Sequence, residues 1–494
     1  MNLKLITSQA NIKYLLPLTA LAAGSRAFPL VEKIYYLLPF LLIYFIIVGI
    51  KEIRLNKTLK ITVLLLLLFS VWGIITSFWS SYPLITITRS LYFALISIGS
   101  ITGGFLYLKS NKRSGLNFAL PLNIFIIFLS FISLIFKIPA DAWTGGDGKG
   151  FMGFASHQNT LGALILFTIP ASIWGIIKEV TEKAKDKVKV GLKFNSKFKI
   201  QNSKFLLLLL IFSFSFLIIT YSRAAMLSLF VAALIYLFII FKWKFILISS
   251  LLLTTVFCLL ATLPSLRNDT WSLLKKGYSD PFFTRRILWG PSYKAAIQGG
   301  LIGIGYGISD PNIILTGTGS HYTSSQSVIS TEGRNPLRSS VISTTDGRRN
   351  PQLDESTHSV ISTTEGRRNP PNSAIIPSEE RIQENGRYIR EKGNSTLAFI
   401  EETGVVGLIL FLLPLGYIIY ELIRRRLKNG VVENILIFSF IIAFILHAQF
   451  EAWWVGVGSI ELPLFFMCFG LAAAVISNPL IPKPCLPRMR EEIP

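Results

Sequence analysis

Cysteine and acidic residues are both scarce in this chain of 494 residues. Only three cysteines are present, two of them inside apolar runs, so neither a disulfide framework nor a cysteine-based metal site is expected. The 27 acidic residues stand against 49 lysines and arginines, which gives a formal net charge of +22. This charge could indicate a nucleic-acid-binding protein, but the basic residues gather in segments between apolar runs. We therefore expect no nucleic-acid partner.

Charges are also rare within a series of long apolar runs. Hydrophobic residues make up 51% of the chain, and roughly 20 apolar residues allow a helix to cross a hydrocarbon core of about 30 Å. This excludes a soluble globular protein. The runs are rich in Leu, Ile and Phe, which favours helices over the short alternating strands of an outer-membrane barrel. The sequence thus predicts an all-α polytopic membrane protein with about twelve transmembrane helices. The expected spans are 12–29, 33–50, 59–78, 88–108, 116–136, 158–177, 205–221, 223–241, 244–263, 397–420, 434–451 and 456–477.

Basic residues occupy every second loop between these runs. Because cytoplasmic loops carry an excess of Lys and Arg, the basic loops and both chain ends are predicted to be cytoplasmic. The first run loosely imitates a signal peptide, but treating it as a membrane helix keeps the alternation in phase. The basic loops are Lys51–Leu59, Lys109–Gly115, Lys178–Lys204, Lys242–Lys244 and Glu421–Glu433, and the outer loops are Trp79–Arg89, Lys137–His157 and Pro264–Thr396.

The expected domain organisation is a membrane region interrupted by one large outer loop. Residues 1–263 carry the first nine helices, 264–396 form the extracytoplasmic loop, and 397–494 carry the last three helices and a cytoplasmic tail. Three unevenly spaced copies of a Ser-Val-Ile-Ser-Thr motif ending in Asn-Pro lie within the loop. Their composition offers too few apolar residues for a core, so we expect a disordered insertion over about 323–383. A passive insertion is favoured over one whose arginines bind anionic glycans or lipid headgroups.

Four polar motifs lie at predicted outer membrane boundaries. An Arg beside a helix end is usually an anchor to the headgroups, so no single motif is informative. Their common face, however, indicates chemistry outside the cytoplasm. The motifs are Gly153–Asn159 (Gly-Phe-Ala-Ser-His-Gln-Asn), the turn Thr220–Ala225 with Arg223, the segment Arg285–Gly307 that begins Arg-Arg-Ile-Leu-Trp, and Asn394–Gly407 with its Glu-Thr-Gly step.

In this order the four motifs resemble those of the O-antigen ligase and polymerase family, the Wzy-type polymerases and lipopolysaccharide core ligases. The resemblance covers about Gly150 to Gly407. It implies a GT-C-type, multi-pass glycosyltransferase of the bacterial cytoplasmic (inner) membrane that needs no metal or other cofactor. The implied donor is an undecaprenyl-diphosphate-linked glycan among the membrane lipids, and the implied acceptor is a second glycan or a lipid. Guanidinium groups could stabilise the negative charge that develops on the diphosphate.

The resemblance also assigns residues to the site. Arg223 matches the Ser-Arg turn and Arg285 the Arg four residues before the Trp, so both are expected to be catalytic. Arg286 is the neighbouring candidate for binding substrate. Asn159 could contact a sugar hydroxyl or a diphosphate oxygen, or equally cap a helix. Glu402 is expected in a salt bridge with one of the arginines, because an unpaired carboxylate at a membrane edge is unfavourable. His157 and Asn394 complete the expected substrate-binding set.

One position departs from the ligase pattern. The ligases carry a His immediately before the Asn of the fourth motif, whereas this chain has Gly393. The expected general base, or acceptor-positioning group, is therefore missing from its usual place, which disfavours a strict lipopolysaccharide ligase. His321, just before the repeats, could supply the imidazole as a catalytic residue. His447, beside Glu451, is another candidate, although a buried and satisfied histidine is the more common case.

Two other classes of function suit a polytopic membrane protein. One is a transporter, such as a flippase for lipid-linked oligosaccharides, and the other is a scaffold of the cell envelope. Transporters tend to show two related halves and polar sites in mid-membrane. This chain instead places its arginines at one face, beside one dominant outer loop. The enzyme is the favoured class.

Overall fold

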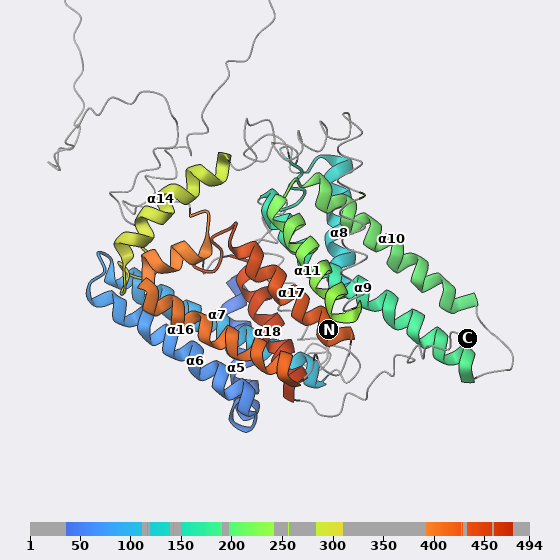
Figure 1. Cartoon of the computed structure of the whole chain (residues 1–494), viewed down its shortest axis with the longest axis horizontal. Helices are drawn as coiled ribbons and strands as arrows, with labels where there is room; N and C mark the ends of the chain where they lie inside the picture. Colours follow the sequence, from blue (N-terminus) through green and yellow to red (C-terminus); the bar gives the residue numbers. More distant parts are fainter. Residues whose placement is uncertain are drawn as a thin grey trace, which may run out of the picture.

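The computed structural model describes residues 36–110, 116, 119–138, 142, 150–155, 157–189, 197–241, 255, 283–309, 392–425, 427, 432–456 and 459–477. All regular secondary structure within these ranges is helical (Figure 1). The predicted spans 12–29 and 244–263, the repeat insertion and His321 lie outside the described residues, apart from residue 255. The helices are α5 (Leu38–Leu55), α6 (Lys57–Ile75), η2 (Thr76–Phe78), α7 (Pro83–Ser110), α8 (Ala119–Phe136), α9 (Gln158–Lys189), α10 (Lys197–Ile219), α11 (Arg223–Phe241), α14 (Phe283–Gly299), α16 (Ser395–Arg425), α17 (Val432–Ala448) and α18 (Glu461–Ser477).

Six helical segments of the described chain are long and apolar enough to cross a membrane. Three shorter apolar helices accompany them. The predicted all-α class is therefore confirmed for the described residues, and their long apolar helices indicate a multi-pass membrane protein. The count of twelve spans and the GT-C type stay predictions. The six segments are Lys57–Phe78, Pro83–Lys109, Ala119–Phe136, Gln158–Val180, Arg223–Phe241 and Ser395–Arg425, and the shorter helices are Lys204–Ile219, Val432–Ala448 and Glu461–Ser477.

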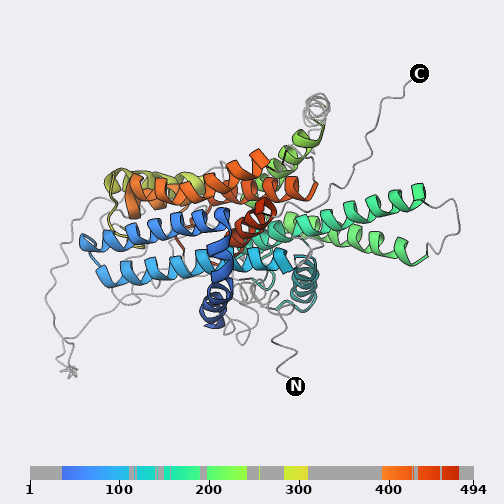
Figure 2. The same cartoon turned by 90° about the horizontal axis from the view of Figure 1, so that it is seen from below.

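The basic segment 178–204, predicted as a loop, is mostly helical. Helix α9 continues to Lys189 and α10 begins at Lys197, so the two form a long hairpin that projects beyond the other helices (Figure 2). Lys, Glu and Ala, which dominate the first half of this segment, are all favourable helix formers. The first charged residues therefore show where a helix leaves the apolar region, but the helix itself continues beyond them.

Several of the predicted basic segments meet at one end of the bundle. The C-terminal ends of α5 and α7 meet at an ion pair between Glu52 and Lys109 (2.5 Å), and a short turn at Asn56 joins α5 to α6. Arg424 and Arg425 end α16. At the other end of α6, the Trp72 indole donates to the carbonyl of Thr403 at 2.9 Å. The N-terminal part of α16, which carries the fourth motif, thus lies far from the basic ends.

Reporter fusions will test the orientation that these basic ends imply. We expect fusions at Val190 and Leu427 to report a cytoplasmic location and a fusion at Asp280 to report the opposite side. Alkaline phosphatase and a fluorescent protein, which are active on opposite sides of the membrane, make a matched pair of reporters. Phosphatase activity at Val190 or Leu427 would contradict the orientation.

Small residues permit a close contact between two helices of the bundle. Helices α7 and α18 pack along each other. A Cβ atom added to Gly104 would lie 2.3 Å from the carbonyl oxygen of Met467, and one added to Gly470 would lie 2.1 Å from that of Ile101. Between membrane helices the surrounding lipid removes most of the hydrophobic drive, so such backbone approach is a main source of association.

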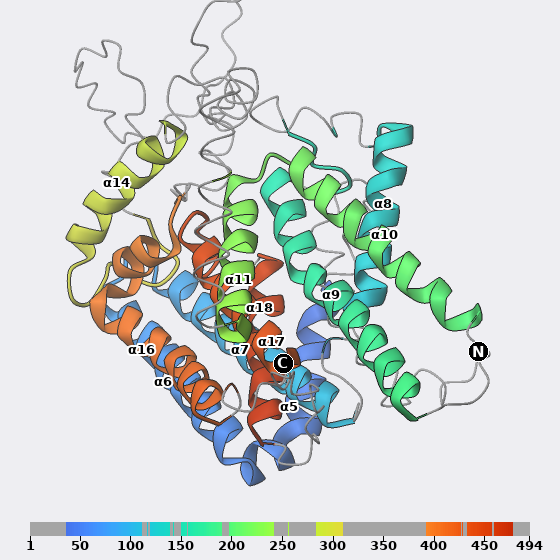
Figure 3. The same cartoon turned by 45° about the vertical axis from the view of Figure 1, so that its right-hand side comes forward.

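A buried polar contact joins the helices that carry the first two motifs. The Asn123 amide of α8 donates to the Ser172 hydroxyl of α9 at 2.8 Å. Its carbonyl oxygen accepts from the Ser213 hydroxyl of α10 at 3.0 Å. Helices α9 and α10 also lie side by side (Figure 3). The N-terminal end of α9 and the C-terminal end of α10 are therefore held next to each other.

Candidate functional site

The chain segments that flank the first motif pack against the second motif and the residue before it. The Phe151 amide donates to the carbonyl of Ile219 at 2.9 Å. A Cβ atom added to Gly162 would lie 2.7 Å from the Ser222 Cβ, so the turn between α10 and α11 touches the first turns of α9. Arg223 follows this turn as the first residue of α11, which packs along α17. Its backbone is thus placed at the same end of the bundle as the first motif.

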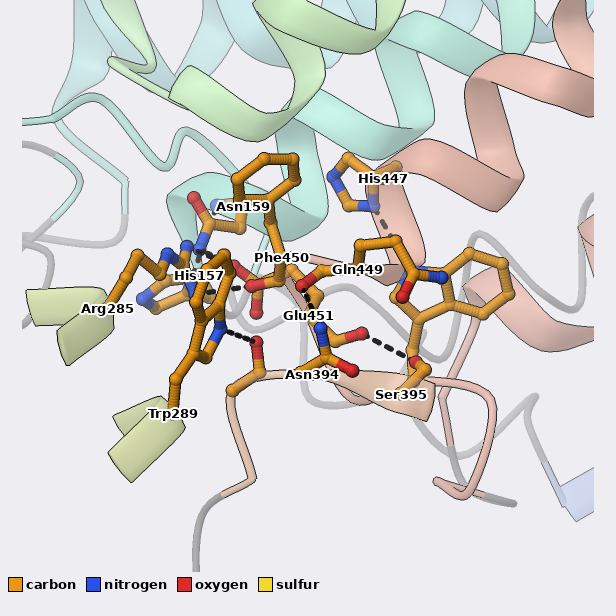
Figure 4. A network of polar contacts seen from close by, with 12 residues as sticks. His157, Asn159, Arg285, Trp289, Asn394, Ser395, His447, Gln449, Phe450 and Glu451 are labelled. Atoms are coloured by element: carbon orange, nitrogen blue, oxygen red, sulfur yellow. Dashed lines mark hydrogen bonds and ion pairs between the residues drawn. The ribbon is translucent and has the colours of Figure 1, made fainter. Parts of the chain in front are cut away.

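The residues that follow α17 connect the first, third and fourth motifs (Figure 4). The Arg285 guanidinium donates through Nη2 to Glu451 Oε1 at 2.8 Å. The Asn159 amide donates to the same oxygen at 2.5 Å. The Ser395 hydroxyl donates to the backbone carbonyl of Glu451 at 2.6 Å. Glu451 therefore has bonds from the first, third and fourth motifs, and we call Asn159, Arg285, Asn394, Ser395 and Glu451 the Glu451 cluster.

Further bonds fix the backbone around Glu451. Arg285 Nη1 donates to the carbonyl of Phe450. The Asn394 amide donates to the carbonyl of Gln449 at 2.8 Å, and its own oxygen accepts from the Leu397 amide at 2.9 Å. Asn394 therefore caps the start of α16 and holds the turn after α17 at the same time.

His157, and not Asn159, caps α9. The imidazole Nδ1 of His157 accepts the backbone N–H of Asn159 at 3.1 Å. This satisfies one of the free amides at the first turn of the helix. The Asn159 side chain is thereby left to bond Glu451. Of the two roles expected for Asn159, the cap is wrong, and contact with a sugar or diphosphate stays a prediction.

Helix α14 lies beside the N-terminal part of α16 (Figure 1). It packs against Gly393, the position at which the ligase pattern would place a histidine. The Trp289 indole donates to the carbonyl of Gly393 at 2.9 Å. A Cβ atom added to Gly393 would lie only 2.7 Å from the Cβ of Leu288. An imidazole at this position would require α14 to move. Arg286 also lies in α14, but its side chain is outside the described part of the chain.

The glycine-rich ends of the third and fourth motifs pack closely and form backbone hydrogen bonds with each other. The amides of Ile304 and Gly305 donate to the carbonyls of Glu401 and Glu402, each at 3.0 Å. Gly404 has a φ of 72°, which breaks the predicted single span 397–420. A Cβ atom there would also lie 2.1 Å from the Leu301 carbonyl oxygen. Position 404 requires glycine, because the backbones of the third and fourth motifs touch there and a positive φ disfavours residues that have a Cβ atom.

Glu402 forms its salt bridge with a lysine, so the expectation of an arginine partner is wrong. Lys392 donates to Glu402 Oε1 at 2.6 Å, and the Gly307 amide donates to Oε2 at 2.7 Å. Lys392 also lies 3.3 Å from Glu401 Oε2. The Glu402 side chain is only 3% exposed. Its position, with both oxygens bonded, suits a structural role beside the site better than contact with a substrate.

His447 is buried behind the Glu451 cluster. Its Nδ1 accepts from the Trp453 indole at 3.1 Å, and the residue is 1% exposed. The Nε2 atom has no hydrogen-bond partner among the described residues. His447 therefore lies near the site but has little surface that could face a substrate.

The Arg285–Glu451 and Lys392–Glu402 ion pairs at this end of the bundle differ in exposure. The Arg285 and Glu451 side chains are 16% and 26% exposed, whereas those of Lys392 and Glu402 are 6% and 3% exposed. The Arg285 pair is thus open to a ligand and the Lys392 pair is not. Within the described ranges, no group of three or more His, Cys, Asp and Glu is arranged to hold a metal ion.

Sequence patterns drew attention to Glu451 only as a neighbour of His447. One signal was nevertheless present, because an acidic residue at the end of an apolar run is unfavourable unless it is paired. Gln449-Phe450-Glu451 follows the apolar helix α17 directly. The predicted span 434–451 placed this segment inside a helix, whereas α17 ends at Ala448.

Fold and site together define a multi-pass helical membrane protein with an ion-paired polar cluster at one end of its bundle. Comparisons of the chain with protein-family models, with curated proteins and with solved structures find no match. The likeness to the O-antigen ligase and polymerase family therefore depends on the four motifs alone.

Proposed function

We propose that this protein is a membrane glycosyltransferase that transfers or polymerises a glycan carried on a polyprenyl diphosphate. The reaction would take place at the outer face of the bacterial cytoplasmic membrane, within a GT-C-type architecture. The observation that supports this most is the convergence of three separate motifs on one residue, Glu451. Polar residues that only anchor helix ends to lipid headgroups need no common partner. In an active site, by contrast, side chains from different motifs must be brought together.

The chemistry of such a donor suits the residues in the cluster. As the bond between the sugar and the diphosphate breaks, its electron pair passes to the diphosphate. A preorganised guanidinium stabilises this charge without a metal ion. Arg285 uses one N–H on Glu451 and one on Phe450, and a guanidinium has five in all. The remaining donors, together with Arg223, would bind the phosphate oxygens.

The location of the cluster also suits a donor with a lipid tail. Asn159, Ser395 and Glu451 all lie at or beyond helix ends. A diphosphate at headgroup level would reach this end of the bundle while its polyprenyl chain stayed in the hydrocarbon. The acceptor, a second glycan or a lipid, would approach from the aqueous side.

The purified protein in lipid nanodiscs provides a direct test. We expect it to convert a synthetic polyprenyl-diphosphate glycan into a longer glycan or a transfer product, with release of the polyprenyl diphosphate and with no loss of activity in EDTA. Chain extension identifies a polymerase, and transfer only to an added lipid acceptor identifies a ligase. The Arg285→Ala protein is the negative control. Movement of the intact donor across proteoliposome membranes, with no new glycosidic bond, would instead indicate a flippase.

A further inference from the structure

We infer that the Glu451 carboxylate is the general base that takes the proton from the acceptor hydroxyl. The inference rests on the proposed glycosyl transfer and assigns the group that the Gly393 position lacks. It is supported by the geometry of the Glu451 carboxylate, by the hydrogen bonds of His157 and His447, and by the exposure of the side chains that could act as a base.

The two oxygens of Glu451 have different surroundings. Oε1 accepts from both Arg285 Nη2 (2.8 Å) and Asn159 Nδ2 (2.5 Å). The Ser395 hydroxyl holds the backbone carbonyl of Glu451, so the residue is fixed at both ends. Oε2 has no hydrogen-bond partner among the described residues, and it is not among their fully buried, unpartnered atoms. The hydrogen bonds to Oε1 therefore fix the orientation of the carboxylate, while Oε2 stays accessible to a proton donor.

Neither described histidine offers an open proton-accepting nitrogen. A neutral imidazole has one accepting nitrogen and one N–H. His157 Nδ1 accepts the Asn159 amide, and His447 Nδ1 accepts the Trp453 indole. In both rings the proton is then on Nε2, which can only donate. Glu402 is excluded as well, because both of its oxygens are bonded and its side chain is buried.

In the proposed step, the acceptor hydroxyl oxygen replaces the diphosphate on the donor sugar. The acceptor O–H gives its proton to Glu451 Oε2 while its oxygen forms a bond to the anomeric carbon of the donor sugar. The bond between that carbon and the diphosphate oxygen breaks, and its electron pair leaves with the diphosphate. Arg285 bonds Glu451 and would also bind the leaving group, so one side chain sets the spacing between base and diphosphate.

Three variants separate a base from a structural residue. Glu451→Gln keeps an oxygen for Arg285 and Asn159 but cannot take a proton. We expect its kcat for glycan transfer to fall by about a hundredfold or more, as is usual when a general base is removed, with the donor KM no higher than in the wild type. Glu451→Asp should keep partial activity. The control Glu52→Gln alters a glutamate at the opposite end of the bundle, paired with Lys109, and should match the wild type.

Azide provides the decisive measurement, because this anion attacks without losing a proton. We expect Glu451→Gln to form glycosyl azide from the lipid-linked donor at about the wild-type rate while its transfer to the hydroxyl acceptor stays low. Normal transfer to the hydroxyl acceptor, or loss of azide transfer as well, would overturn the inference. If the wild type itself forms no glycosidic bond with either nucleophile, the proposed function fails instead.

Discussion

Replacing Arg285 by alanine should lower glycan transfer by about a hundredfold or more while the protein stays folded in the membrane. One charge-assisted contact made in the transition state contributes on the order of 3 kcal/mol. Arg285 is 16% exposed and lies on a partly open ion pair, so a diphosphate can reach it. Arg285→Lys should restore activity only in part, because an ammonium lacks the planar fork that suits phosphate oxygens. Turnover of a synthetic lipid-linked donor is the measurement.

Arg223→Ala should have a similar effect, and Arg424→Ala provides the control. Arg424 lies in the last turn of α16 at the basic end of the bundle, where its side chain is 62% exposed. If the two outer arginines were only headgroup anchors, lysine would replace them fully and alanine would change expression more than turnover. Near-normal transfer by both Arg223→Ala and Arg285→Ala would remove these residues from the mechanism and weaken the proposed function.

Replacing Lys392 by methionine should destabilise the protein severely. Lys392 is the cation that pairs with two buried carboxylates, at 2.6 Å from Glu402 and 3.3 Å from Glu401. Removing one partner of a buried pair typically costs about 3–5 kcal/mol, because a charge is left without compensation. We expect a large fall in the thermal midpoint of the purified protein and in its amount in the membrane.

Lys109→Met is the matched control for this effect. Lys109 also forms an ion pair, with Glu52 at 2.5 Å, but its side chain is 55% exposed. Exposed pairs contribute about 1 kcal/mol or less, so this variant should unfold close to the wild-type temperature. Equal thermal midpoints for the Lys392→Met and Lys109→Met proteins would show that the buried lysine stabilises the protein no more than the exposed one.

Local properties explain why the class of fold was predictable. The run that follows Arg223 is almost entirely apolar, and its helix Arg223–Phe241 matches the predicted span residue for residue. The boundary between α9 and α10 was not predictable from charge, because lysine-rich sequence can continue a helix into water. The break at Gly404 was also missed, since it depends on contact with Leu301, about a hundred residues earlier in the chain.

The site was predictable only in part, for a related reason. The four motifs were visible because polar residues and glycines interrupt apolar runs at one predicted face. Glu451 was overlooked because its partners Asn159 and Arg285 are separated from it by 292 and 166 positions. Likewise, nothing in the sequence indicated that Glu402 would pair with Lys392, ten residues earlier, and not with an arginine.

The sequence alone determined that this is an all-α, multi-pass membrane protein and which segments could carry its chemistry. Both follow from local free energies, because each apolar run favours a helix in lipid regardless of its neighbours. Only the tertiary structure decided that Asn159, Arg285 and Ser395 meet at Glu451 and that α14 closes the position of Gly393. Lipid contributes little to the choice of helix partners, so that choice depends on small residues and polar contacts distant in the chain.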